Sequence, residues 1–229
     1  MNTAQRYREF ARDSRDESPA YEELAAAVAE DQELLRLLDD LPEPKRQPNL
    51  LFAATRYLGG PVMPPAAFRD WAMSHWADLT ATMRERSTQT NEPARCATLL
   101  PVLAGLPQPL ALLEVGAAAG LCLHPDEYQY RFDGLSVGPR ESLVRIDCAI
   151  SGDVPVPAEV PKVVWRAGIE LNPLDVADDN DMRWLESLIW PGQPERVARL
   201  RAAARIVRAH PPMIRRGDLL AELPALAAQ

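Results

Sequence analysis

The chain has 229 residues, of which 47% are hydrophobic and 25% charged, a balance typical of a globular protein with a buried core. Its formal net charge is −8, which argues against a protein that holds nucleic acid by its phosphates, because such binding depends on Lys and Arg. No segment approaches the roughly 18 consecutive apolar residues that span a bilayer, so neither nucleic acid nor membrane is expected as a partner.

The N-terminus and the cysteines predict a cytoplasmic protein. Residues 1–17 are charged throughout and lack the apolar stretch of a secretory signal. Cys96, Cys122 and Cys148 form a sparse, odd set, unlike the paired cysteines of a small secreted domain. No histidine stands at ligand spacing from any of them, so no metal site is expected.

The first hundred residues have the apolar spacing of helices. Leu24, Val28 and Leu35 recur at helical intervals and predict one helix over residues 21–41. A second long helix is expected to begin at Pro64-Pro65, where a missing amide proton is harmless, and to continue past residue 83.

Two shorter helices flank that segment. The first is expected over residues 47–58, ending at the glycine pair 59–60. The second is expected to follow Asn91, whose side chain is of the type that caps helices, and to reach about Leu103.

The pattern changes after residue 107. The apolar run from Leu110 to Gly116 reads as a buried strand of a parallel sheet. A helix is expected after it, over residues 119–128. Two further strand candidates, over 143–150 and 162–166, are expected to form an inserted hairpin or ribbon. The remaining expected elements are a strand ending at 169–171, helices over 181–190 and 194–210, a strand at 213–215 and a helix over 218–226.

The connection over residues 116–120, called the bend below, is the most informative segment. Gly116 and Gly120 frame three alanines, Ala117, Ala118 and Ala119. Such small residues let a ligand approach the backbone, and the amides that open a following helix then face it.

The bend resembles the first motif of S-adenosylmethionine-dependent methyltransferases, an acidic residue followed by x-G-x-G-x-G. Glu114 and Gly116 match this motif, Gly120 fits its last glycine, and Ala118 replaces the middle one. The resemblance implies that Glu114 helps to hold the methionine amino group of S-adenosylmethionine, with the backbone of Gly116, Ala117, Ala118 and Gly120 against the cofactor.

Two further motifs follow in the order expected for that family. Gly168 to Asp175 looks like the end of the second strand, where Glu170 would bind the ribose hydroxyls with Asn172 beside it. Glu170 lies 50 residues beyond Gly120, whereas about 20 is usual, so Asp147 is a rival for this role. Asp218 resembles the acidic residue that meets the adenine edge.

The whole chain also resembles an uncharacterised family of bacterial proteins. The resemblance rests on a Thr-x-x-Asn-Glu-Pro-x-Arg-Cys stretch, here Thr88 to Cys96, and on a Leu-Glu-Val-Gly-Ala-x-Ala-Gly-Leu turn, here Leu113 to Leu121.

These motifs predict an α/β protein with a helical N-terminal domain over residues 1–106. Residues 107–229 are expected to form a partial, methyltransferase-like, doubly wound sheet with the hairpin inserted. About three of the seven strands of such a sheet can be placed before the chain ends. We therefore expect either a truncated form, a form that lost its chemistry, or a homodimer that completes the sheet.

The first functional hypothesis is a methyltransferase-like protein that binds S-adenosylmethionine and, if it is active, acts on a small molecule. No catalytic residue can be named, and the methyl acceptor stays open. The alternative is a non-catalytic α/β scaffold for protein association, and a third reading is a dinucleotide enzyme. An α/β-hydrolase is disfavoured, because Ala118 stands where its nucleophile would be.

Several other polar residues are candidates for the site or have a structural explanation. His124, with Asp126 and Tyr128, follows the bend and could face a ligand, and Arg95 could contact a substrate. His75 reads as a packed helix residue. The acidic residues 178–181 are expected to form a helix N-terminus. The solvated face of another helix is expected to carry Arg196, Arg199, Arg201, Arg205 and Arg208.

Overall fold

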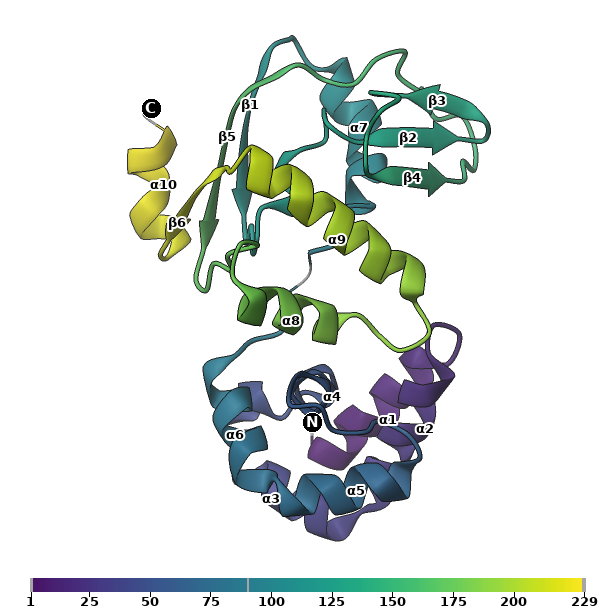
Figure 1. Ribbon diagram of the computed structural model, residues 1–229, viewed down its shortest axis with the longest axis vertical. Helices are drawn as coiled ribbons and strands as arrows, with labels where there is room; N and C mark the ends of the chain where they lie inside the picture. Colours follow the sequence, from purple (N-terminus) through teal and green to yellow (C-terminus); the bar gives the residue numbers. More distant parts are fainter. Residues whose placement is uncertain (1, 90, 228–229) are drawn as a thin grey trace. The chain divides into compact units, whose positions relative to one another are not determined.

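The computed structural model describes residues 2–89 and 91–227 (Figure 1). The chain forms two compact units, one made of residues 1–89 with 183–194 and the other of 90–182 with 195–229. The helix that contains Cys96 was expected in the helical domain over residues 1–106. It belongs instead to the second unit. No helix among the described residues is both long and apolar enough to cross a membrane.

The first unit is helical. Residue 31 divides the single helix predicted over 21–41, because the Asp31 carboxylate accepts hydrogen bonds from the backbone N–H groups of Glu33 and Leu34, both at 3.0 Å, and so caps a new helix. The second predicted long helix is likewise divided at His75, whose ring stacks on Trp71. Up to residue 89 the unit comprises α1 (Thr3–Ser14), α2 (Pro19–Glu30), α3 (Gln32–Asp39), η1 (Glu43–Lys45), α4 (Pro48–Tyr57), α5 (Pro65–Ser74) and α6 (Trp76–Glu85).

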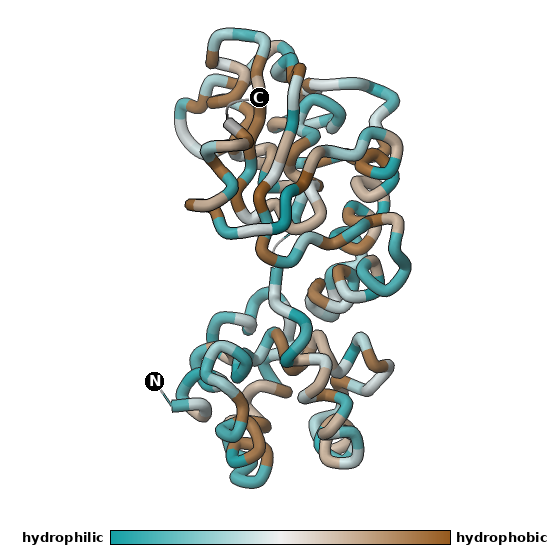
Figure 2. Tube along the Cα trace, turned by 90° about the vertical axis from the view of Figure 1, so that its left-hand side faces the viewer, coloured by the Kyte–Doolittle hydropathy of each residue, from teal (hydrophilic) through white to brown (hydrophobic). Residues whose placement is uncertain are grey.

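Aromatic side chains fill the core of this unit. Phe52 of α4 contacts the rings of Tyr7, Tyr21 and Phe68, with centroids 5.0–6.0 Å apart. All four side chains are buried. Hydrophobic and hydrophilic residues alternate along these helices (Figure 2), as expected when one face of each helix is buried.

The second unit is built on a parallel sheet of three strands. They are β1 (Leu110–Val115), β5 (Val163–Glu170) and β6 (Met213–Arg216), in the order β1-β5-β6. The strand predicted over 110–116 is confirmed. The candidates at 162–166 and 169–171 belong to one strand, β5, in the middle of the sheet, so 162–166 is not part of a hairpin.

The two faces of the sheet are covered differently. Side chains alternate along a strand, and Ala167 and Ile169 of β5 therefore share one face, where they pack against Leu226 of α10 (Leu219–Ala227) (Figure 1). Arg166, Gly168 and Glu170 share the opposite face. This face receives the bend and the segment that follows it. Helix α9 spans Pro194–Ala209.

The helix predicted over 119–128 is wrong, because only the short turn η2 (Leu121–Leu123) forms there. The carbonyl groups that such a helix would use have other partners: Tyr128 donates its hydroxyl to Leu121 O, and Arg166 donates to Leu123 O. Pro125 also lacks the amide proton that a helix needs at that position.

A second small sheet stands between η2 and β5. Strand β2 (Gln129–Phe132) pairs antiparallel with β3 (Leu135–Val137) and parallel with β4 (Arg145–Cys148). The insertion thus includes a hairpin, but β2 and β3 form it, ahead of the strand candidates at 143–150 and 162–166. Helices α7 (Arg95–Gly105), α8 (Asp179–Leu188), α9 and α10 and strand β6 complete the chain, near the ranges expected.

Candidate functional site

Every second residue of the bend has the left-handed backbone conformation. Gly116, Ala118 and Gly120 have φ values of 73°, 50° and 74°. The two glycines adopt this conformation freely, whereas Ala118 costs about 1–2 kcal/mol. Hydrogen bonds hold the conformation, since Gly116 N donates to Ile169 O at 2.8 Å and Gly120 N donates to Ala117 O at 2.6 Å.

Only one end of the bend is bare. A Cβ atom on Gly116 would meet no atom within 4 Å, whereas one on Gly120 would lie 2.8 Å from Pro212 Cγ. The side chains of Ala117 and Ala118 are buried, and Ala117 Cβ lies directly over Gly168. A ligand can therefore approach the backbone at Gly116, while the rest of the bend is packed against the sheet.

Glu170 points into the bend. Its Oε2 accepts a hydrogen bond from Ala118 N at 2.8 Å, and its Oε1 accepts one from Asn172 N at 3.0 Å. The side chain of the rival, Asp147, lies on β4 in the other sheet and pairs with Arg131 at 2.6 Å. Of the two acidic candidates, Glu170 is the one that lies at the bend.

Glu114 lies two residues ahead of the open glycine. It pairs with Gly168 in the register of β1 and β5, so its side chain is on the same face as Glu170. Its Oε2 is buried and has no hydrogen-bond partner. Burial raises the pKa of Glu114 to about 7, with the positive charge of Arg95 opposing that rise and the negative charge of Glu170 adding to it.

Asn91 does not have the helix-capping role that the sequence predicted. Helix α7 begins at Arg95, and Asn91 does not cap it; the Asn91 Nδ2 group is buried without a partner. Glu92 instead accepts from Ala94 N at 3.0 Å and binds Arg196 and Arg199 at 2.6 and 2.7 Å.

The contacts of the arginines over residues 196–208 and of the acidic residues 178–181 test two further predictions. Arg196 and Arg199 are ion-paired and partly buried, so that part of the predicted solvated face is wrong, and Arg208 Nε donates to Val176 O. Asp178 Oδ1 accepts from Asn180 N and Asp181 N at 2.8 and 2.9 Å, which confirms a helix N-terminus.

The remaining predicted site residues lie beyond the strand ends. Asn172 follows β5 and is exposed. Asp218 follows β6, and its Oδ1 accepts from Leu220 N at 2.8 Å, so its side chain caps α10. This cap gives Asp218 a structural role whether or not it also meets a ligand.

A cavity of about 630 Å³ adjoins the bend. It lies between Ala119, the loop after β5 and the connection from α9 to β6. Its lining is mostly aliphatic, with one carboxylate and one guanidinium: Ala119, Pro173, Leu174, Asp175, Val176, Ala177, Val207, Arg208, Pro211, Pro212 and Ile214.

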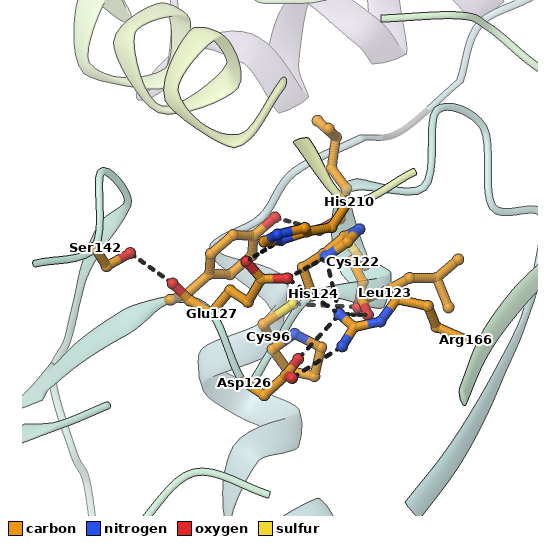
Figure 3. Close-up of polar contacts among 12 residues, drawn as sticks. Cys96, Cys122, Leu123, His124, Asp126, Glu127, Ser142, Arg166 and His210 are labelled. Atoms are coloured by element: carbon orange, nitrogen blue, oxygen red, sulfur yellow. Dashed lines mark hydrogen bonds and ion pairs between the residues drawn. The ribbon is translucent and has the colours of Figure 1, made fainter. Parts of the chain in front are cut away.

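A polar cluster around the segment that follows the bend brings together residues that the sequence left apart (Figure 3). His124 is fully buried and its Nδ1 lies 3.0 Å from Glu127 Oε1. Arg166 of β5 binds Asp126 through two hydrogen bonds, and His210 contacts Glu127. The sequence pointed to His124 and Asp126, but nothing in its spacing linked them to Arg166 or His210.

A comparison with known families identifies the group to which these features belong. The model of a family described as "Uncharacterized protein conserved in bacteria (DUF2332)" matches residues 4–229. The chain belongs to this family. The resemblance read from the stretches at residues 88–96 and 113–121 is thereby confirmed. No curated protein and no solved structure matches the chain.

Proposed function

We propose that this protein binds S-adenosylmethionine at the bend and is a methyltransferase-like protein acting on a small molecule. The observation that carries the proposal is the buried, unpartnered Oε2 of Glu114, two residues ahead of the open backbone of Gly116. A buried carboxylate oxygen without a donor is costly, and a ligand that brings an ammonium group removes that cost.

The arrangement of the strands supports the same ligand. The parallel order β1-β5-β6 puts the ends of β1 and β5 side by side, as in nucleotide-binding sheets. Glu170 ends β5 beside the bend, and each of its oxygens retains a lone pair for a hydroxyl group after accepting one backbone hydrogen bond. Glu170 therefore suits the two hydroxyls of a ribose.

Residues near α7 extend this site. Arg95 is exposed, and its charge acts on Glu114. Nearby in the chain, Asn91 has an unsatisfied Nδ2 group. An amino-acid ligand carries an ammonium and a carboxylate group, and Glu114 and Arg95 supply the two opposite charges. S-adenosylmethionine supplies an electrophilic methyl group, and the role of these residues is to bind and orient it.

Calorimetry with S-adenosylmethionine tests this proposal. Gly116→Val places a branched side chain in the open space and should weaken binding at least about tenfold, or about 1.4 kcal/mol. Gly134→Val is the matched control, because Gly134 also has a positive φ, 94°, and nothing within 4 Å of its Cβ position. The control should bind as the parent does. Equal affinity for both variants, or no heat from the parent, contradicts the proposal.

A second role, in association, is favoured by one observation. Strand β1 pairs only with β5 among the described residues, which leaves its other edge open. Val102 of α7 and Leu106, which directly follows that helix, are also exposed, at 64% and 46%. A second copy pairing along β1 would complete the sheet as a homodimer, and light scattering that shows a monomer at all concentrations would exclude it.

A further inference from the structure

The cavity that adjoins the bend lies within the second unit and has mostly apolar walls. Its volume of about 630 Å³ falls in the range of small-molecule sites. Leu174 and Val176 of the loop after β5 and Val207 of α9 contribute buried side chains to its lining. Proline and alanine side chains from the bend, the loop and the connection into β6 extend this apolar surface. None of the lining residues is assigned to S-adenosylmethionine.

Contacts between the segments fix the walls of this cavity. The loop after β5 is joined to the bend, because Leu174 N donates to Ala118 O at 3.2 Å. The end of α9 is joined to the same loop by a hydrogen bond from Arg208 Nε to a backbone carbonyl group. The connection into β6 packs on the bend through Pro212, whose Cγ lies 2.8 Å from the position of a Cβ on Gly120. The cavity is therefore formed by the folded chain before any ligand arrives, as small-molecule sites usually are.

Arg208 is the single cation of the lining. Its Nε donates to Val176 O at 2.5 Å, whereas its Nη1 and Nη2 groups have no hydrogen bond or ion pair among the described residues. The Nε contact holds the guanidinium against the loop and leaves both Nη groups for a ligand. Two neighbouring N–H groups of a guanidinium match the two oxygens of a carboxylate. The cavity therefore offers one binding position for a carboxylate group.

Asp175 is the single anion of the lining, and it does not pair with Arg208. Its Oδ1 accepts a hydrogen bond from Ala177 N at 2.8 Å, which shapes the loop. Within the part of the chain that the structure describes, it forms no ion pair with any cation. The positive charge of Arg208 is thus left for a ligand, while the negative charge of Asp175 repels an anion in the cavity.

We propose that this cavity binds a monocarboxylic acid with an apolar body. The ionised carboxylate lies on the Nη groups of Arg208, and the body lies among the proline and aliphatic side chains. Burial of the body supplies affinity, and the guanidinium selects the charged head group. Acids with an aliphatic chain and acids with an aromatic ring share this chemistry, so the test includes both. This binding does not use the open backbone at Gly116 and goes beyond the proposed function.

Calorimetry with the full chain at about neutral pH tests this site, because carboxylic acids are then ionised. The probes are octanoate and cinnamate, each compared with its neutral amide. The parent should bind at least one acid, and should bind it at least about tenfold more tightly than the matching amide. Arg208→Gln should weaken that acid at least about tenfold and leave the amide as it was, because the apolar walls are unchanged.

Two further variants complete the design. Arg205→Gln is the matched control, because Arg205 is an exposed arginine of the same helix outside the lining, and this variant should bind both forms as the parent does. Asp175→Asn keeps an oxygen for Ala177 N but removes the opposing charge. It should tighten the acid about twofold or more without changing the amide.

Four results overturn the proposal: a parent that binds neither acid, a parent that binds acid and amide equally, an Asp175→Asn variant that binds the acid more weakly, and a folded Arg208→Gln variant that keeps the parental preference. Arg208 is exposed, so its variant is expected to fold, and a melting curve checks this. Tighter binding of cinnamate assigns an aromatic body, and tighter binding of octanoate an aliphatic one. No S-adenosylmethionine is present, and the outcome is therefore separate from that of the bend.

Discussion

Replacement of Glu114 by glutamine should change the stability of the protein in a pH-dependent way. The stability of the variant minus that of the parent should increase as the pH rises from acidic to alkaline. The pKa of Glu114 is raised to about 7 in the folded protein from an ordinary value of 4.5. The folded state therefore holds a proton that the unfolded chain gives up, and stability falls as pH rises through that window. Glutamine has no proton to lose, so its variant lacks this dependence.

The size of the effect follows from the pKa difference. Each unit is about 1.36 kcal/mol, so the cost of ionising Glu114 grows by about 2–3 kcal/mol between about pH 5 and about pH 8. For a protein of this size, each kcal/mol corresponds to about 2–4 °C in melting temperature. The melting temperature of Glu114→Gln minus that of the parent should therefore increase by about 5–10 °C between the two pH values.

The assay is thermal unfolding followed by circular dichroism at both pH values. Comparing the two differences cancels any constant cost of the buried amide. Glu141→Gln is the control, because Glu141 is an exposed glutamate of the same unit. If Glu114→Gln follows the parent at both pH values, the carboxylate is not a destabilised, ligand-ready group and the reasoning fails.

Two further substitutions probe the packing around the site. Gly168→Ala would place a Cβ 2.4 Å from Ala117 Cβ, so urea unfolding should show a loss of about 1–3 kcal/mol, and an unchanged midpoint would contradict the packing of the bend. Glu92→Gln removes the anion that binds Arg196 and Arg199, and should cost about 1–3 kcal/mol at neutral pH. Burial alone would raise the pKa of Glu92, but the arginine hydrogen bonds lower it, so this loss should fade as pH falls below 4.5; an equal loss in acid would argue against the ion pairs.

Two strands of the parallel sheet, β1 and β6, and the end of the third, β5, could be predicted because they carry their own signals, whereas the first half of β5 was assigned to a hairpin. The apolar run of β1 ends at a glycine, and β6 is short but stands between two clear helices. The acidic residue at the end of β5 was also recognisable, since Glu170 follows an apolar segment. Such signals lie within a few consecutive residues, and they depend only weakly on residues that are distant in the sequence.

The structure after the bend could not be predicted in the same way. A helix there is prevented by partners distant in sequence, such as Arg166, which holds Leu123 O. Short strands such as β3 carry too few residues for an alternating pattern to be recognised. The contact between Glu127 and His210 joins residues 83 positions apart.

The central claim is that an adenosyl amino acid lies against Gly116 with its ammonium group on Glu114. A crystal structure with S-adenosylhomocysteine tests this most directly. The account predicts the amino group within hydrogen-bond distance of Glu114 Oε2 and the ribose hydroxyls on Glu170. A ligand bound elsewhere on the chain, with the Glu114 oxygen still lacking a donor, would contradict it.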